Sequence, residues 1–400
     1  MRWVGVCSLL LLFPISLSVR AEERVPDGPT IKDFTDPVYK SRIRQIHNPD
    51  GHAHNLYYYR DPWNADGSRI VGVLCDLEQK NWRLCLFDGD GRFIKQLFPI
   101  EKYDWRLCWD RKGPEILYTW KGSDLYRFNV ASGRAEVLKS FAPLFLKPNG
   151  PSLNQAGDRI LVITSDNVFR SYRLPDMGEQ RTFTATIPPG CNIDWGKPRY
   201  IGNRNYIDTA CKSNDLTEQA IVVYDDTGDV VHKFDAIGGG GHYDFSPDGK
   251  LAYFKLSRGT RSPGGESPLE IHTVKLDGTD DRALFSVPRP QAAYVQNLHL
   301  SWPAKVNDWF IASFFPATGN VPAVYAPPLD EILMIRTDGT HRYLARTGMV
   351  YSRAGARGGA GDMFWAQPLG RPSADGKCIC FNSNRSGTID MNILYVHGWQ

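Results

Sequence analysis

Residues 51–67 bring two histidines, three tyrosines, an arginine and an Asp-Gly turn together in the segment GHAHNLYYYRDPWNADG. A His-x-His pair can bind a metal ion or transfer a proton, because neutral imidazole is a metal ligand and titrates near neutral pH. The rest of the segment is typical of a strand that runs into a hairpin turn. Which interpretation holds for His52 and His54 depends on what repeats along the chain.

A ten-residue pattern shows which part of this segment is repeated. FSPDGKLAYF (245–254) aligns with WNADGSRIVG (63–72) and with PSADGKCICF (372–381), and in each a turn precedes an apolar run. Weaker copies begin at Trp109, Leu153, Trp195 and Trp302. Seven starts predict seven similar units, and they assign Pro62 to Gly67 to the scaffold.

A second series of turns lies between alternating apolar runs, at intervals of roughly 40 to 60 residues, the period of β-propellers. These turns are DGDG (88–91), SGR (132–134), PDMG (175–178), DDTG (225–228), DGT (277–279) and DGT (338–340). One four-stranded unit cannot bury its apolar faces alone, so the units must close into a ring. We therefore predict an all-β fold, a seven-bladed β-propeller forming a single domain over residues 22–400. Two packed β domains are the alternative.

The two ends of the chain are predicted to close this ring. The last unit ends in NILYVHGWQ (392–400), which supplies a third strand but no fourth. The segment RIRQIHN (42–48) is a suitable fourth strand. Pairing the two leaves no open sheet edge.

Residues 1–21 have the features of a secretory signal: an early Arg2, an apolar run and a small-residue end at Ala21. We therefore expect an exported protein, and no other segment has the ~20 apolar residues of a membrane span. Without Arg2 and Arg20 the count of Lys plus Arg falls from 47 to 45, against 44 acidic residues. This near-neutral balance argues against nucleic acid or an anionic membrane as the partner.

Seven cysteines follow the signal segment, so at least one thiol stays outside any intramolecular disulfide. Cys378 and Cys380 are expected to share one face of a strand and not to bond each other. Cys191 and Cys211 could oppose each other across one hairpin. The sequence has no Cys-x-x-Cys motif, which excludes a zinc ribbon or a thioredoxin-type site.

The innermost strands of a propeller line its central channel, and ligands usually bind where these strands begin. Aligning the Asp-Gly turns places one residue of each blade at this depth. The seven residues are Arg60, Arg106, Gly150, Asn192, His242, His299 and Leu369. Four of them can carry positive charge and one is an amide, which indicates an anionic ligand such as a carboxylate. Inter-blade ion pairs and structural histidines are the alternative interpretation. His52 and His54 fall upstream, in the crossing from the closing strand to the first blade.

In these residues the chain resembles the oligogalacturonate lyases, propeller polysaccharide lyases that cleave pectin fragments by β-elimination. The resemblance covers most of residues 40–400 and includes the SPDG-type blades that TolB-type propellers also have. Three histidines carry its specific part. His54 is followed by Tyr59 and by the turn Asp66-Gly67-Ser68, and His242 is followed by YDFSP and Asp248-Gly249. The third is His299. The resemblance implies that His242 is the general base and that His54 contacts the substrate.

The resemblance also implies a divalent metal, Mn or Ca, with His299 as one ligand. In the last blade the family carries His-Pro-His, whereas this chain has Gln367-Pro368-Leu369. The metal motif is thus degenerate, because an amide oxygen is a weak ligand and leucine is none. His299 and Gln367 are the residues left to hold a metal.

The expected activity is therefore β-elimination on an anionic, uronic-acid oligosaccharide or polysaccharide. His242 would remove the C5 proton, and Arg60 and Arg106 would neutralise the carboxylate. Tyr58 or Tyr59 would donate to the leaving oxygen or stack on a sugar, and their opposite parity on a strand lets only one face inward. Asn192 would contact the substrate from another blade. The alternatives are a metal-independent lyase for a different uronate and a non-catalytic TolB-like propeller that binds a partner protein or a glycan.

Overall fold

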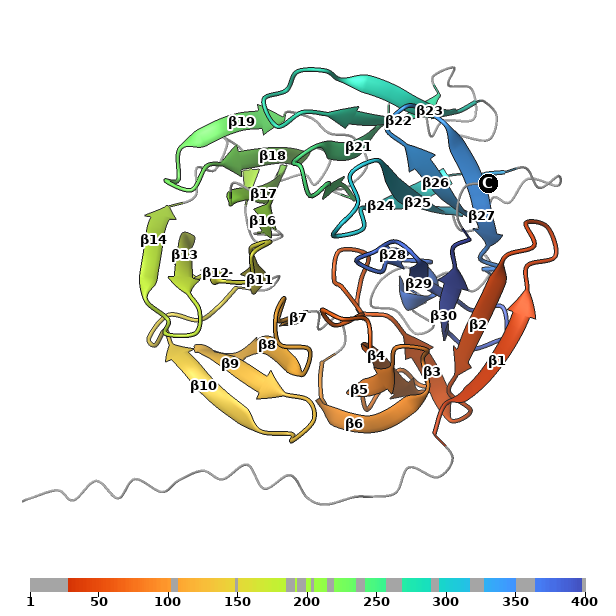
Figure 1. Ribbon diagram of the computed structural model, residues 1–400, viewed down its shortest axis with the longest axis horizontal. Coiled ribbons are helices and arrows are strands. Elements are labelled where there is room, and N and C mark those ends of the chain that lie inside the picture. The colour runs from red at the N-terminus through yellow and green to blue at the C-terminus, as the bar shows by residue number, and fades with distance from the viewer. Residues whose placement is uncertain are drawn as a thin grey trace, which may run out of the picture.

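The computed structural model shows a ring of sheets around a central axis (Figure 1). It describes residues 28–101, 107–147, 150–184, 191–192, 199–202, 205–213, 219–234, 242–256, 268–288, 295–316, 327–349 and 364–397. These residues form seven antiparallel sheets, which confirms the predicted seven-bladed β-propeller. Within the same ranges, no helix has the length and apolar content needed to cross a membrane.

Each blade runs outward from the axis, from its first strand to its last (Figure 1). Blade 1 has β3 (Gly51–His54), β4 (Arg69–Asp76), β5 (Arg83–Asp88) and β6 (Phe93–Pro99). Blade 2 has β7 (Leu107–Trp109), β8 (Ile116–Lys121), β9 (Asp124–Asn129) and β10 (Ala135–Ser140). Blade 3 has β11 (Ser152–Leu153), β12 (Arg159–Ile163), β13 (Val168–Arg173) and β14 (Glu179–Thr184).

The inner strand of blade 4 is divided into two short pieces, both paired with the same neighbour. This blade has β15 (Cys191–Asn192), β16 (Arg199–Ile201), β17 (Tyr206–Ser213), β18 (Gln219–Tyr224) and β19 (Val230–Phe234). Blade 5 has β20 (Asp244–Phe245), β21 (Leu251–Leu256), β22 (Leu269–Val274) and β23 (Arg282–Val287). Blade 6 has β24 (Val295–Ser301), β25 (Trp309–Pro316), β26 (Glu331–Arg336) and β27 (His341–Arg346).

Blade 7 joins the two ends of the chain, as the sequence predicts. It has β28 (Arg371–Pro372), β29 (Cys378–Ser383), β30 (Asp390–Tyr395), β2 (Arg42–His47) and β1 (Thr30–Thr35). Strand β2 pairs antiparallel with β30, with Ile43 opposite Leu394. Strand β1, which the sequence analysis did not anticipate, adds a fifth strand at the outer edge.

The repeated turns connect the strands where the sequence places them. In blades 1, 5 and 7 the Asp-Gly turn follows the inner strand, and Gly67, Gly249 and Gly376 have φ angles of 76°, 91° and 74°. Glycine adopts these positive φ values without the steric cost that a side chain would add. The recurring Gly at this position is therefore a requirement of the turn, and the turn sets where each blade begins.

The inner strand of blade 1 differs from the prediction. His52 and His54 do not lie in a crossing segment but on β3, which pairs with β4 so that His54 is opposite Val73. The chain rejoins β4 only at the isolated bridge between Trp63 and Ile70. Residues 55–61 between these two pairings therefore leave the sheet.

The cysteine predictions have two outcomes. Cys378 and Cys380 both lie on β29, opposite Tyr395 and Ile393, and both are free. In blade 4 the register pairs Cys191 with Ser213, so Cys191 and Cys211 do not oppose each other directly. The register is shifted by two residues from the predicted one.

A buried acidic pair lies at the start of β26. Asp330 is 3% exposed and accepts hydrogen bonds from the Thr347 hydroxyl and, at 3.0 Å, from the Gly348 amide. Burial raises the pKa of Asp330 to about 7, and the neighbouring Glu331 carboxylate adds to this increase. In the unfolded chain the same group titrates near 3.8. Between these two values the folded protein holds the extra proton, so its free energy of unfolding falls as pH rises.

We expect the Asp330→Asn variant to lose this pH dependence. The amide keeps the shape of the carboxyl group and stays neutral, so the variant gains stability relative to the wild type between pH 5 and pH 8. Between pH 3.8 and pH 7 the change in free energy of unfolding is at most about 4 kcal/mol, and at most about 3 kcal/mol of it falls between pH 5 and pH 8. Urea unfolding of both proteins at pH 5 and pH 8 measures the difference, with the exposed Asp338→Asn as control. If the free energy of unfolding changed with pH equally in the wild type and the variant, Asp330 would be ionised in the folded wild type over this whole pH range.

Candidate functional site

Three consecutive tyrosines fill the axis of the propeller. Tyr57, Tyr58 and Tyr59 are at most 7% exposed, and their ring centroids are 4.8 to 5.2 Å apart. The Arg60 amide donates to the Tyr57 carbonyl at 3.0 Å, so the segment turns instead of running extended. Strand parity therefore does not decide which of Tyr58 and Tyr59 faces inward, because both residues lie in a turn.

Two predicted site histidines, His242 and His299, meet on one side of this aromatic segment. His242 precedes β20 and His299 lies in β24, and their ring centroids are 4.2 Å apart. The Tyr58 ring lies 5.6 Å from His242 and 4.8 Å from His299. His299 is fully buried, whereas His242 is partly exposed.

The hydrogen bond of His242 fixes its orientation. Its Nδ1 lies 3.1 Å from the Leu298 carbonyl oxygen, which can only accept, so Nδ1 carries the proton. In the neutral ring this tautomer leaves the lone pair on Nε2. His242 can therefore accept a proton through Nε2, as a general base does.

His54 lies in a closed aromatic environment. Its ring is 4.2 Å from Trp365 and 5.1 Å from Trp82, and it is 1% exposed. Trp365 belongs to the short 3-10 helix η3 (Phe364–Ala366). Burial lowers the pKa of His54 to about 3, so the ring is neutral. This packing is that of a core histidine, and contact of His54 with a substrate remains a prediction.

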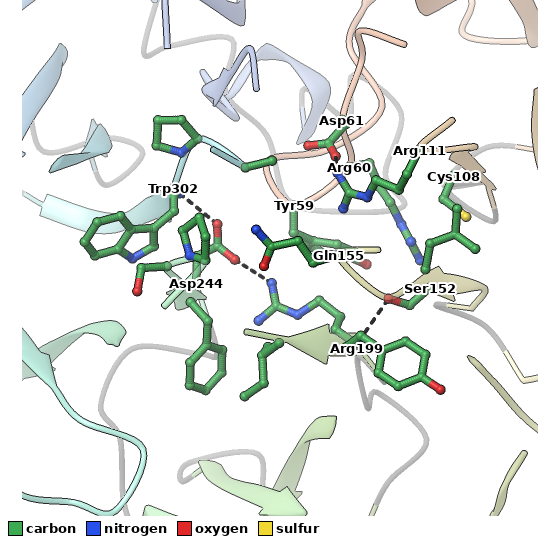
Figure 2. Close-up of a pocket in the computed structure, with 18 of the residues that line it drawn as sticks. Tyr59, Arg60, Asp61, Cys108, Arg111, Ser152, Gln155, Arg199, Asp244 and Trp302 are labelled. Carbon is green, nitrogen blue, oxygen red and sulfur yellow. Dashed lines mark hydrogen bonds and ion pairs between the residues drawn. The ribbon is translucent and has the colours of Figure 1, made fainter. Parts of the chain in front are cut away.

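Arginine and aspartate side chains from several blades line a recess beside Tyr59, among them Asp61, Arg111, Arg199 and Asp244 (Figure 2). Arg371 Nε donates to Asp61 at 2.8 Å, and its Nη1 donates to Asp244 at 3.0 Å. Asp244 also accepts from Arg199 Nη1 at 2.7 Å, and Asp61 from Arg111 Nη1 at 3.2 Å. Arg371 of blade 7 thus connects blade 1 with blade 5 across the axis. Burial would raise the pKa of Asp61, but Arg371 and Arg111 outweigh it and hold that pKa below its usual value.

Arg60 contributes a further guanidinium group to this region. Its Nη1 donates to the Pro151 carbonyl at 2.9 Å, and its guanidinium carbon is 5.1 Å from the centre of the Tyr59 ring. Burial lowers the pKa of Arg60. Arg60 lines the same recess as Arg199 and Arg371, whereas His242 does not. The two predicted catalytic residues thus contact neighbouring tyrosines, His242 the Tyr58 ring and Arg60 the Tyr59 ring.

The remaining predicted residues are placed less completely. Arg106 lies outside the described residues. Asn192 belongs to β15, where its backbone pairs with Lys212, and its side chain is outside the described part of the structure. Gln367 follows η3, and its backbone N–H donates to the Phe364 carbonyl at 3.2 Å. Leu369 is fully buried, with a φ angle of 48°.

The donor groups near His299 do not fit a divalent metal site. Within the described ranges, no three His, Cys, Asp or Glu side chains are grouped closely enough to hold a metal ion. A catalytic zinc-type site uses three protein ligands. His242 and His299 instead pack ring against ring, with 31° between their planes. We therefore derive no catalytic step through a metal.

Five charged residues of this recess were not predicted from the sequence, namely Asp61, Arg111, Arg199, Asp244 and Arg371. Asp244 and Arg371 follow His242 and Leu369 by two residues, and side chains two apart on a strand share a face. Extending the alignment by two residues along these strands would therefore have predicted that Asp244 and Arg371 also face the channel. For Arg199 there was no such signal, because the inner strand of its blade is divided.

The fold is similar to that of solved oligogalacturonate lyases. A structure described as oligogalacturonate lyase in complex with manganese has a TM-score of 0.66 at 15% identity, covering 93% of this chain and 97% of that chain. Oligogalacturonate lyase from Vibrio parahaemolyticus has a TM-score of 0.65 at 11% identity, covering 93% and 98%. The β-propeller domain of Myceliophteria thermophila Cps50 (Swd1) has a TM-score of 0.50 at 12% identity, covering 88% and 98%. The sequence itself matches no family model and no curated protein. At these identities the similarity shows the propeller fold.

Proposed function

We propose that this protein cleaves uronic-acid oligosaccharides by β-elimination, with His242 as the general base. The observation that carries the proposal is the position of His242, partly exposed beside the propeller axis with Nδ1 donating to Leu298. The fold similarity to two oligogalacturonate lyases supports the same substrate class.

The reaction needs a base, a cation and a proton donor. His242 Nε2 takes the proton from C5, the C–H electron pair forms the C4–C5 double bond, and the C4–O bond breaks as its oxygen takes a proton from the hydroxyl group of Tyr58 or Tyr59. An arginine neutralises the uronate carboxylate as negative charge develops, which is usually the larger contribution to the rate. Arg60 is the proposed arginine, since it belongs to the same turn as Tyr58, whose ring contacts His242.

This proposal assigns charge neutralisation to arginine and no step to a metal. A divalent ion held by His299 and Gln367 stays a prediction from the family resemblance, and the described donors do not favour it. We further propose that the substrate is met after export, with residues 1–21 removed as a signal peptide. An anionic oligosaccharide is then the partner, and nucleic acid is not.

The test is incubation of the purified protein with a panel of uronic-acid polymers and oligomers, with Mn²⁺, with Ca²⁺ and with a chelator. We expect an unsaturated product from at least one substrate, measured by the absorbance of the new double bond, at equal rates with and without the chelator. Product that forms only with added metal would contradict the metal-independent mechanism. No product and no binding across the panel would favour a non-catalytic, partner-binding propeller.

A further inference from the structure

A recess opens at the end of the axis opposite His242. Six of the residues that line it lie in the turns after inner strands, namely Arg111, Gln155, Gly202, Pro247, Pro303 and Ala304. His242, in contrast, precedes the inner strand of its blade. The recess is therefore reached from the face that carries these turns, and Tyr59 of the tyrosine segment lines it.

The recess has room for the acidic end of one sugar ring. Its volume is about 130 Å³, close to the ~150 Å³ that holds a benzene molecule, and the rest of a hexuronate ring would extend out of its open side. A second recess of about 220 Å³ adjoins it and shares Asp61, Trp109, Arg111, Gln155 and Ala304. The exposed Lys305 lines this second recess. The two recesses form one continuous depression over the same face.

The polar groups of the first recess suit an acidic sugar. Arg111 bonds Asp61 through Nη1, and its side chain is 37% exposed at the mouth. A guanidinium group has five N–H donors, so Arg111 can bind a carboxylate without releasing Asp61. Asp61, 26% exposed, can accept from sugar hydroxyl groups, and Gln155 adds an exposed amide. Guanidinium, carboxylate and amide groups together match a ligand with one carboxylate and several hydroxyl groups.

We propose that this depression is a second binding site, separate from the His242 site, for a hexuronate and for short hexuronate oligomers. The carboxylate of one ring contacts Arg111 in the first recess, and the next ring lies over the second recess toward Lys305. The role proposed for this site is binding, and cleavage is assigned to the His242 site.

The experiment measures binding by calorimetry in the His242→Ala protein, which removes the proposed base and so separates binding from turnover. The probes are galacturonate, glucuronate, a galacturonate trimer and neutral galactose. We expect both uronates to bind, galactose to bind at least tenfold more weakly, and the trimer to bind more tightly than the monosaccharide. Arg111→Gln should weaken uronate binding by about tenfold, the effect of losing one charge-assisted hydrogen bond. Gln155→Trp should abolish binding by filling the recess.

Arg92→Gln is the matched control, since Arg92 is an exposed arginine that pairs with aspartates in a turn of blade 1. It should bind uronate as the parent protein does. Unchanged binding in both Arg111→Gln and Gln155→Trp would place the ligand elsewhere and overturn the proposal. Absence of uronate binding in the parent protein would also overturn it and leave the arginines with a structural role. Neither outcome bears on cleavage by the intact protein, which the polymer panel measures separately.

Discussion

Replacing His242 by alanine is expected to lower the rate of uronate cleavage by about 10²–10⁴-fold, the usual contribution of a general base. The imidazole Nε2 is the proton acceptor in the proposed reaction, and alanine has no group that can take its place. The rate is measured from the absorbance of the unsaturated product. Because His242 is partly exposed and donates to the Leu298 carbonyl from Nδ1, its loss should change the urea midpoint less than the loss of a fully buried residue would.

Two controls distinguish a missing base from a damaged fold. The exposed His341→Ala variant, in β27, should keep the wild-type rate. Added imidazole should restore part of the activity of His242→Ala, since a small base can enter the space left by the side chain. A wild-type rate in His242→Ala would show that another group removes the proton.

The fold was predictable because its signals are local. Each Asp-Gly turn needs a glycine with positive φ, and the copies at Gly67, Gly249 and Gly376 mark the same point of three blades. The C-terminal segment supplies only three strands of the last blade, which indicated that a fourth must come from elsewhere in the chain, and β2 is that strand. The outermost strand β1 has no turn signal of this kind, and its side chains are exposed or half-buried without strict alternation.

The site was predictable only in part, because side-chain positions at the axis depend on blades that are distant in sequence. His242 and His299 meet as their common register predicts. Arg60 shares that register, but the turn at Tyr57 to Arg60 takes it out of the strand and into the arginine-aspartate recess. Likewise, the pairing of Arg371 with Asp244 joins residues 127 positions apart. No local pattern indicates such a pair.

The arginine-aspartate network is expected to carry the largest stability effect in the molecule. Arg371→Met should lower the free energy of unfolding by at most about 3–5 kcal/mol, because it removes a cation that the buried Asp244 and the partly exposed Asp61 share, while Arg199 and Arg111 still pair with them. The Arg371 side chain is 9% exposed, and those of Asp61 and Asp244 are 26% and 7% exposed. Arg371 Nη1 also donates to the Ser301 hydroxyl at 2.9 Å, which in turn donates to the Tyr58 carbonyl. The substitution therefore also removes a support of the tyrosine segment.

Urea unfolding measures this effect, and a second substitution tests its cause. If the cost comes from uncompensated buried charge, adding Asp244→Asn to Arg371→Met should recover part of the lost stability, since it neutralises one of the two carboxylates. The exposed ion pair of Arg92 serves as reference, and Arg92→Gln should cost at most about 1 kcal/mol. If Arg371→Met were as stable as Arg92→Gln, the network would not hold the blades together. Its arginines would then be retained for binding anions at the axis rather than for closing the ring.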